Sequence, residues 1–117
     1  MIPLAQQSDT EIRAVIEPLI ANMLEGSAEI NHEKHVRDFT DRLKVIVTDE
    51  NLSRQCADYQ EHLGLFRKWE FVALFRRELS IAATWRLFFT KSDDEFVLEA
   101  MFVMRGGRLK IEHCMIF

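Results

Sequence analysis

Two side chains of this 117-residue sequence are the best candidates for chemistry, His113 and Tyr59. On the strand pairing derived below, His113 is the one ionisable group on the apolar face of the last hairpin. There its imidazole can act as a general base or as a hydrogen-bond donor to a ligand. Tyr59 lies on the apolar stripe of a predicted helix and can direct its hydroxyl into the same space. Structural alternatives stay open, because a core histidine can bond a backbone carbonyl and a tyrosine can simply pack its ring.

The residues expected around His113 can leave room for a ligand. Ala100 is predicted to lie opposite His113, and its small side chain leaves space beside the imidazole. Trp69 and Trp85 can line such a site, although large aromatic residues in a small core more often serve packing alone. The predicted ligand-binding residues are Tyr59, Trp85, Leu98, Ala100, Phe102 and His113.

Other reactive side chains show no pattern of a metal or cofactor site. His32 and His35 are three residues apart on a predicted helix, but two histidines are fewer than the three or four ligands that zinc sites use. Cys56 and Cys114 have no metal-ligand spacing and are interpreted as reduced thiols of a cytoplasmic protein. The sequence has no glycine-rich phosphate loop and no serine nucleophile motif, so we predict neither metal nor cofactor.

The element that must position these residues is an antiparallel sheet after residue 68. Gly106-Gly107 predicts a two-residue turn between strands 95–105 and 108–117, because both central positions of such a turn need positive φ. Pairing Arg105 with Arg108 places an almost wholly apolar set of side chains on one face, namely Phe96, Leu98, Ala100, Phe102, Met104, Leu109, Ile111, His113, Met115 and Phe117.

Two earlier strands, 80–90 and 69–77, are expected to extend this sheet. A turn at 91–94 pairs Leu87 with Leu98 and Arg86 with Glu99, which keeps the same face inside. The other face is too apolar to be left in water, which predicts a homodimer through it. Its residues are Ala82, Thr84, Phe88, Val97, Glu99, Met101, Val103, Cys114 and Ile116.

Helices are predicted before residue 68. Ser8 begins a first helix through a capping box with Glu11, Pro18 kinks or divides it, and Gly26-Ser27 ends it. A second, more polar helix follows Asn31 and runs to about residue 46. Thr48 caps a third, which ends at Gly64. Helices followed by strands favour an α+β domain, with N-terminal helices packed on one face of a curved antiparallel sheet of about four strands.

Composition sets the class of protein. The length favours one domain over residues 1–117, with 48% hydrophobic and 29% charged residues. A formal net charge of −4 disfavours nucleic acid as a partner. No apolar run approaches the roughly 20 residues of a membrane helix, and no signal peptide is recognised, so no membrane partner is predicted.

The run Leu43-Lys44-Val45-Ile46-Val47-Thr48-Asp49-Glu50-Asn51-Leu52, followed by Tyr59-Gln60 and Leu63-Gly64-Leu65-Phe66, resembles the nuclear transport factor 2-like, or cystatin-like, superfamily. It is especially similar to a bacterial branch of unknown function. The resemblance covers residues 36–117 and implies a cone-shaped fold, a pocket between helices and sheet, and commonly a homodimer through the outer sheet face. It implies no single activity. The inward aspartate of ketosteroid isomerase-like relatives has no counterpart on the last three strands.

The sequence therefore predicts a small-molecule-binding or interaction domain with an apolar pocket, taking a small apolar ligand and forming a homodimer. The alternative is a small isomerase, dehydratase or hydrolase of the ketosteroid isomerase-like type with His113 as general base.

Overall fold

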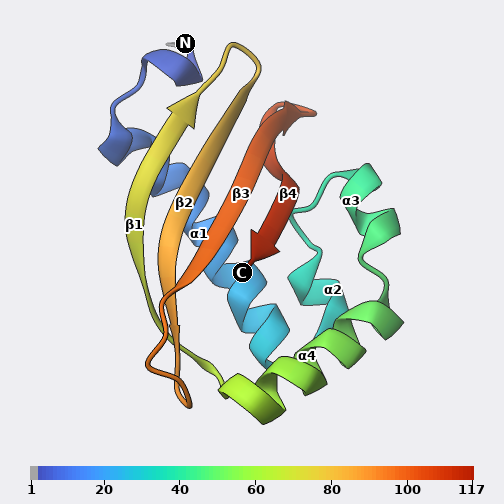
Figure 1. The fold of residues 1–117 in the computed structure, drawn as a ribbon. Helices are drawn as coiled ribbons and strands as arrows, with labels where there is room; N and C mark the ends of the chain where they lie inside the picture. Colours follow the sequence, from blue (N-terminus) through green and yellow to red (C-terminus); the bar gives the residue numbers. More distant parts are fainter. Residues whose placement is uncertain (1–2) are drawn as a thin grey trace.

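A computed structural model describes residues 3–117. A short 3-10 turn, Leu4–Gln6, precedes four helices, α1 (Asp9–Ala28), α2 (His32–His35), α3 (Asp41–Ile46) and α4 (Asp49–Leu63). Four strands follow, β1 (Phe66–Arg76), β2 (Ser80–Phe89), β3 (Phe96–Arg105) and β4 (Arg108–Ile116). They form one antiparallel sheet in the order β1-β2-β3-β4 (Figure 1). The predicted α+β class is confirmed.

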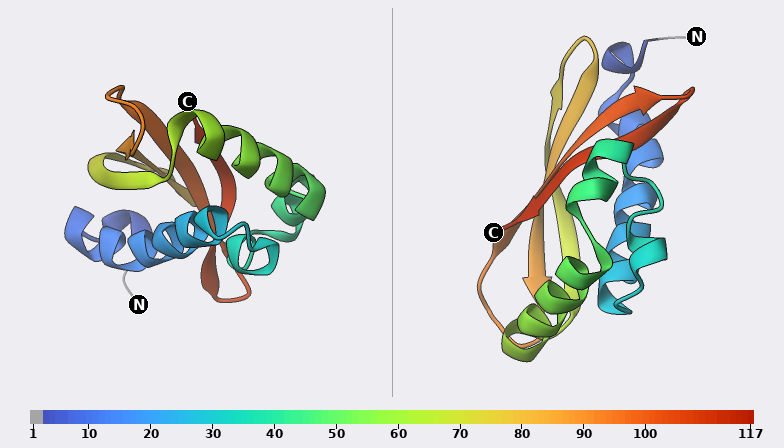
Figure 2. Two further views of the ribbon diagram at one scale, coloured as in Figure 1. Left: turned by 90° about the horizontal axis from the view of Figure 1, so that it is seen from below. Right: turned by 90° about the vertical axis from the view of Figure 1, so that its right-hand side faces the viewer.

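The core lies between α1 and one face of the sheet. Figure 2 shows α1 crossing that face, and Figure 1 shows α2 and α3 beside β4 with α4 at the lower end of the sheet. Ile12, Ile16 and Ile20 recur on one side of α1 at the spacing of a helical face and are fully buried. Opposite them are buried sheet residues, among them Ala83, Trp85, Leu87, Leu98, Ala100 and Phe102.

The predicted helix starts are confirmed by side-chain caps. Ser8 and Glu11 form a reciprocal capping box at α1, and the Thr48 hydroxyl accepts from the backbone N–H of Asn51 at α4. Gly64 follows α4 with a φ of 85°, a conformation that glycine adopts without steric cost.

The first helix ends one residue later than predicted. α1 is one continuous helix to Ala28, so of the two predicted effects of Pro18, a kink or a division, the division does not occur. Gly26 serves a close approach of two helices instead, since a Cβ atom at this position would lie 2.5 Å from the backbone nitrogen of His35. Contact with α2, which local sequence does not reveal, decides the role of this glycine.

The predicted second helix is divided into α2 and α3. Between them Phe39 forms a parallel bridge with Ile111 of β4. The Asp38 carbonyl accepts from the Ile111 N–H at 2.8 Å, and the Thr40 N–H donates to the Ile111 carbonyl at 2.9 Å. The buried Asp38 carboxylate also pairs with Arg108 of β4 at 2.6 Å. These long-range bonds replace the helical ones that the polar pattern of this segment had favoured.

The register of β2 on β3 differs from the prediction by two residues. Trp85 lies opposite Leu98, and Leu87 lies opposite Phe96. Because side chains alternate with a period of two, this shift leaves the predicted inner and outer faces intact. It separates the predicted pair of Arg86 and Glu99, and Arg86 pairs with Glu95 at 2.7 Å instead.

The register of β3 on β4 is as predicted from the Gly106-Gly107 turn to the pair of Phe102 and Ile111. Glu112 is then an extra residue, a β-bulge, and Met101 lies opposite His113. Every residue of β4 after the bulge lies on the face opposite to the one predicted, because a shift by one residue exchanges the two faces.

Two phenylalanines on opposite faces test which side of the sheet forms the core. Phe102 is fully buried, whereas Phe75 on the outer face is 51% exposed. We expect Phe102→Ala to lower the free energy of unfolding by about 3–5 kcal/mol through lost burial and the cavity left behind. Phe75→Ala is the matched control and, at a concentration where the chain is monomeric, should cost under about 1 kcal/mol, as an exposed substitution. Urea unfolding of both variants measures this, and equal losses would contradict the assignment.

Candidate functional site

A cavity of about 610 Å³ lies between the helices and the lower part of the sheet. Its volume is in the range of about 300–1,000 Å³ that is typical of small-molecule sites. Most of the wall is hydrophobic and comes from elements far apart in the sequence. The principal apolar wall residues are Met23, Leu24, Phe39, Leu43, Leu52, Phe89 and Phe96.

Three hydrogen-bonding side chains form a polar end of this cavity. The Ser27 hydroxyl on α1 lies 2.9 Å from the Tyr59 hydroxyl and 3.3 Å from the Cys56 sulfur, both on α4. Burial raises the pKa of Tyr59, against the opposing effect of hydrogen bonds from Gln60 and Ser27. The phenol is therefore protonated at neutral pH, and this end of the cavity is polar but uncharged.

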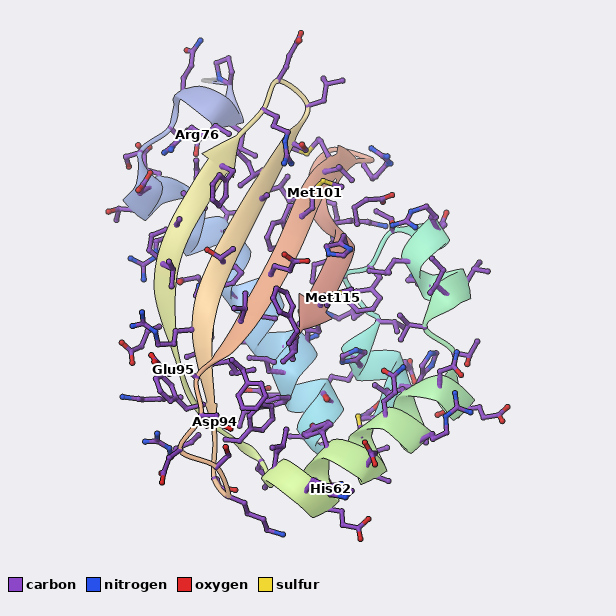
Figure 3. All side chains as sticks on the ribbon, viewed as in Figure 1. His62, Arg76, Asp94, Glu95, Met101 and Met115 are labelled. Atoms are coloured by element: carbon purple, nitrogen blue, oxygen red, sulfur yellow. The ribbon has the colours of Figure 1, made fainter. Side chains whose placement is uncertain are left out.

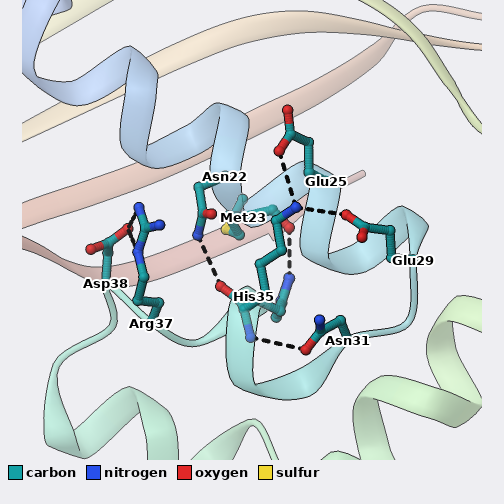
Figure 4. A network of polar contacts seen from close by, with 9 residues as sticks. Asn22, Met23, Glu25, Glu29, Asn31, His35, Arg37 and Asp38 are labelled. Atoms are coloured by element: carbon teal, nitrogen blue, oxygen red, sulfur yellow. Dashed lines mark hydrogen bonds and ion pairs between the residues drawn. The ribbon is translucent and has the colours of Figure 1, made fainter.

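His35 adds a second polar group to the cavity wall. Its Nδ1 lies 2.8 Å from the carbonyl oxygen of Met23, a hydrogen bond drawn in Figure 4. Because the carbonyl can only accept, Nδ1 carries the proton and Nε2 has a free lone pair in the neutral ring. Burial lowers the pKa of His35, and the hydrogen bond to Met23 only partly offsets this. His35 is thus a neutral acceptor near pH 7.

Polar contacts between α1 and α2 hold His35 in place (Figure 4). The Asn22 amide donates to the Lys34 carbonyl at 2.9 Å. The Lys34 ammonium pairs with Glu29 at 2.7 Å and with Glu25 at 3.2 Å. A helix of four residues has too few internal bonds to be stable alone, so these contacts supply its stability.

The predicted position of His113 is wrong. The bulge at Glu112 turns its imidazole to the outer face of the sheet, where Nε2 lies 3.0 Å from the Glu99 carboxylate. His113 still borders the open side of the cavity, but it is not an ionisable group among apolar side chains. The general-base role rested on that environment and loses its support.

Cys114 takes the inward position that had been predicted for His113, opposite Ala100. Burial raises the pKa of the Cys114 thiol to about 12, so it is protonated and a poor nucleophile at neutral pH. The prediction that Cys114 and Ile116 belong to the outer face is also wrong, for the same reason of register.

Of the other predicted ligand-binding residues, Tyr59 lines the cavity and four do not. Trp85 is buried, and its indole Nε1 donates to the Glu17 carboxylate of α1 at 2.9 Å. Trp69 packs edge-on against Trp85 as part of the same aromatic cluster. The residues absent from the cavity wall are Trp85, Leu98, Ala100 and Phe102, which fill the space between the sheet and α1.

Sequence reasoning missed His35 and Ser27 as cavity residues. His35 was considered only as a metal ligand, and within residues 3–117 no group of three or more potential ligands is found. Its partner His32 bonds the Val47 carbonyl at 2.8 Å instead. Ser27 follows Gly26 in a segment that was predicted to end a helix. The one feature of the sequence that points to His35 and Ser27 is that they are polar residues next to an apolar helical stripe.

Comparisons with known proteins identify the fold. No family model matches the sequence, and no curated protein does either. A candidate calcium/calmodulin-dependent protein kinase type II association domain from Thiobacillus denitrificans aligns with a TM-score of 0.65 and 9% identity, over 87% of this chain and 93% of that one. A SEC-C motif containing protein from Rhodopseudomonas palustris aligns with a TM-score of 0.56 and 10% identity, over 88% and 89% of the two chains.

A nuclear transport factor 2-like protein of unknown function from Cytophaga hutchinsonii aligns over 96% of this chain and 91% of that one, with 10% identity and a TM-score of 0.41. That score is too low to support an argument. At these identities the two better alignments show a shared α+β fold and not a shared activity. None of the helices within residues 3–117 is long and apolar enough to cross a membrane.

The protonation state of His35 can be tested against His62. Burial lowers the pKa of His35, whereas a hydrogen bond between the exposed His62 and the Asp58 backbone raises the pKa of His62. NMR titration of the imidazole protons should place His35 below the ordinary value of about 6.5 and His62 above it. Since the unfolded chain then binds a proton at residue 35 more readily than the folded one, the contribution of His35 to stability should fall as pH drops below about 6.5.

Thermal melts between pH 5 and 7 check this linkage. His35→Asn is the comparison variant, because its amide can still donate to the Met23 carbonyl but does not titrate. It should show a flatter dependence on pH than the wild-type chain. A His35 pKa at or above that of His62 would contradict the assignment of a neutral acceptor.

Proposed function

We propose that this chain is a nuclear transport factor 2-like domain that binds a small apolar molecule in the cavity between its helices and its sheet. The observation that carries the proposal is the cavity itself, about 610 Å³ in volume with a mainly hydrophobic wall. A few polar groups converge on it, the His35 ring from α2 and the hydroxyls of Ser27 and Tyr59. This combination of apolar surface with a few fixed polar groups is typical of ligand sites.

The charge state of the wall supports an uncharged ligand. The Tyr59 phenol is protonated because burial raises its pKa, and the His35 ring is neutral because burial lowers its pKa. Arg42 at the rim is paired with Glu112 at 2.6 Å. An apolar molecule enters such a space without leaving a charged group unpaired, whereas a charged ligand would be desolvated without an available counter-ion.

We also propose that two copies pair through the outer face of the sheet. Figure 3 labels Met101 on β3 and Met115 on β4 of this face. Much apolar surface of this face is in contact with water, since the exposed fraction is 51% for Phe75, 49% for Met115 and 37% for Val97. Burying such a surface against a second copy removes it from water at a gain of about 25 cal/mol per Å². The pair of His113 and Glu99 would supply polar contacts within the interface.

A cavity-filling variant tests ligand binding. Leu52 of α4 lines the cavity and is 4% exposed. The added volume of Leu52→Phe should reduce the affinity for the uncharged fluorescent probe N-phenyl-1-naphthylamine, or for hexylbenzene competing with it, by about tenfold. Val45→Phe is the matched control, since Val45 of α3 is 78% exposed and does not line the cavity. Failure of the wild-type chain to bind either probe would contradict the proposal.

A charge on the outer face tests the dimer. Met101→Lys should convert a dimer into a monomer, because pairing would bury an ammonium group without a partner. Val45→Lys adds the same charge on α3, away from the sheet, and should leave the dimer intact. Sedimentation velocity over a range of concentrations distinguishes the two variants. If the wild-type chain is monomeric at high concentration, the dimer proposal is wrong.

A further inference from the structure

The cavity is bordered by the free edge of β4. Five consecutive residues, 113–117, line it. Side chains along a strand alternate between two faces, so an unbroken run of residues borders one cavity only where the edge of the strand itself faces that cavity. β4 is the edge strand of the sheet, and Figure 1 shows α3 and α4 on its outer side.

The hydrogen-bonding pattern shows which backbone groups point into this space. Val97 and Phe117 exchange both of their backbone bonds, at 2.6 and 2.9 Å, so Phe117 turns its N–H and C=O toward β3. In an antiparallel ladder this orientation alternates along the strand. Cys114 and Ile116 therefore turn their N–H and C=O groups away from β3, and within residues 3–117 no hydrogen bond satisfies them.

Nearer the start of β4, the same edge already pairs with the extended segment 38–40. Asp38 and Thr40 bond both backbone groups of Ile111, in a parallel arrangement. That pairing ends where the cavity begins, three residues before Cys114. The lower half of the edge therefore continues an existing strand interface but lacks a partner.

We propose that an extended apolar peptide segment adds to the free edge of β4 at Cys114 and Ile116 and places one of its side chains in the cavity. The inference rests on the proposed function, since it assigns a ligand class to the same cavity. A peptide suits the edge better than a simple amide does. The N–H and C=O of one trans amide point in opposite directions, so meeting both a donor and an acceptor of a strand edge takes two consecutive peptide groups.

The apolar wall explains why the inserted side chain would be hydrophobic. Leu43 and Leu52 from the helices and Phe96 from the sheet face the space beside the edge. Backbone pairing then provides affinity, and the cavity selects the side chain at every second position, as in other cases of strand addition.

A pair of synthetic peptides tests the backbone pairing. The first is a five-residue peptide of alternating leucine and serine, acetylated and amidated at its ends. The second has the same side chains but N-methyl groups on its central amides, which removes their donors. NMR titration should show binding of the first peptide, with downfield shifts of the Cys114 and Ile116 amide protons, and at least about tenfold weaker binding of the second. Equal affinities, or no binding of the first peptide, would overturn the proposal.

Variants at Ile116 test the same contact from the protein side. Ile116→Pro removes the outward N–H at a position where the ladder to β3 does not use it, and proline is tolerated at such edge positions. It should weaken the unmethylated peptide about fivefold, the effect of one hydrogen bond. Ile116→Val retains the N–H and should bind as the wild-type chain does. Unchanged peptide affinity in Ile116→Pro, with its melting temperature preserved, counts against the proposal.

The small apolar probe separates this inference from the proposed function. Hexylbenzene uses the cavity but no backbone group, so any change in its affinity for Ile116→Pro measures the altered cavity wall alone. The peptide should lose more affinity than hexylbenzene does, because it also loses the hydrogen bond to the residue 116 N–H. If hexylbenzene binds and the peptide does not, only the strand addition fails. If neither binds, the proposed function fails as well. If sedimentation shows dimers that Ile116→Pro abolishes, the occupant of the edge is a second copy, and the peptide proposal is wrong.

Discussion

The bulge at Glu112 is the constraint on which the site depends. It inserts one residue into β4 and thereby exchanges the faces of all that follow, so that Cys114 faces inward and His113 outward. The exchange is favourable because a protonated thiol is cheaper to bury than an imidazole that lacks a partner. On the outer face His113 has one, the Glu99 carboxylate at 3.0 Å.

Contacts from distant helices hold the bulge. Arg42 of α3 binds the Glu112 carboxylate and also its backbone carbonyl. Hydrogen bonds to Glu112 from Thr40 and then Arg42 lower the pKa of its carboxyl. Just before it, Ile111 pairs with the segment between α2 and α3. The upper part of the β4 edge is thus covered, while the lower part stays open beside the cavity.

The cavity exists because different helices pack against different parts of the sheet. α1 packs along the centre of the sheet and buries its isoleucines there, leaving no room beside Trp85 or Phe102. α3 contacts β4 at Glu112 through Arg42, and α3 and α4 together form the wall of the cavity opposite the lower edge of β4. The proposed ligand site and the proposed peptide contact are therefore the same mainly apolar space. It holds a free strand edge, a neutral His35 and two hydroxyls.

Local rules determined much of this protein from sequence alone. The caps at Ser8 and Thr48, the stop at Gly64 and the turn at Gly106-Gly107 each depend on neighbouring residues, so the helix starts, the last hairpin and the α+β class were predictable. The inner face of β2 and β3 was predictable too, because a slip by two residues preserves alternation. Only the tertiary structure decided the one-residue bulge, the break of the second helix at Phe39 and the place of the cavity. The bulge and the break arise from contacts between residues about 70 positions apart, such as Arg42 with Glu112 and Asp38 with Arg108, and the cavity arises from contacts among α1, α2 and α4. No local spacing encodes such a contact, since chain folding alone brings those residues together.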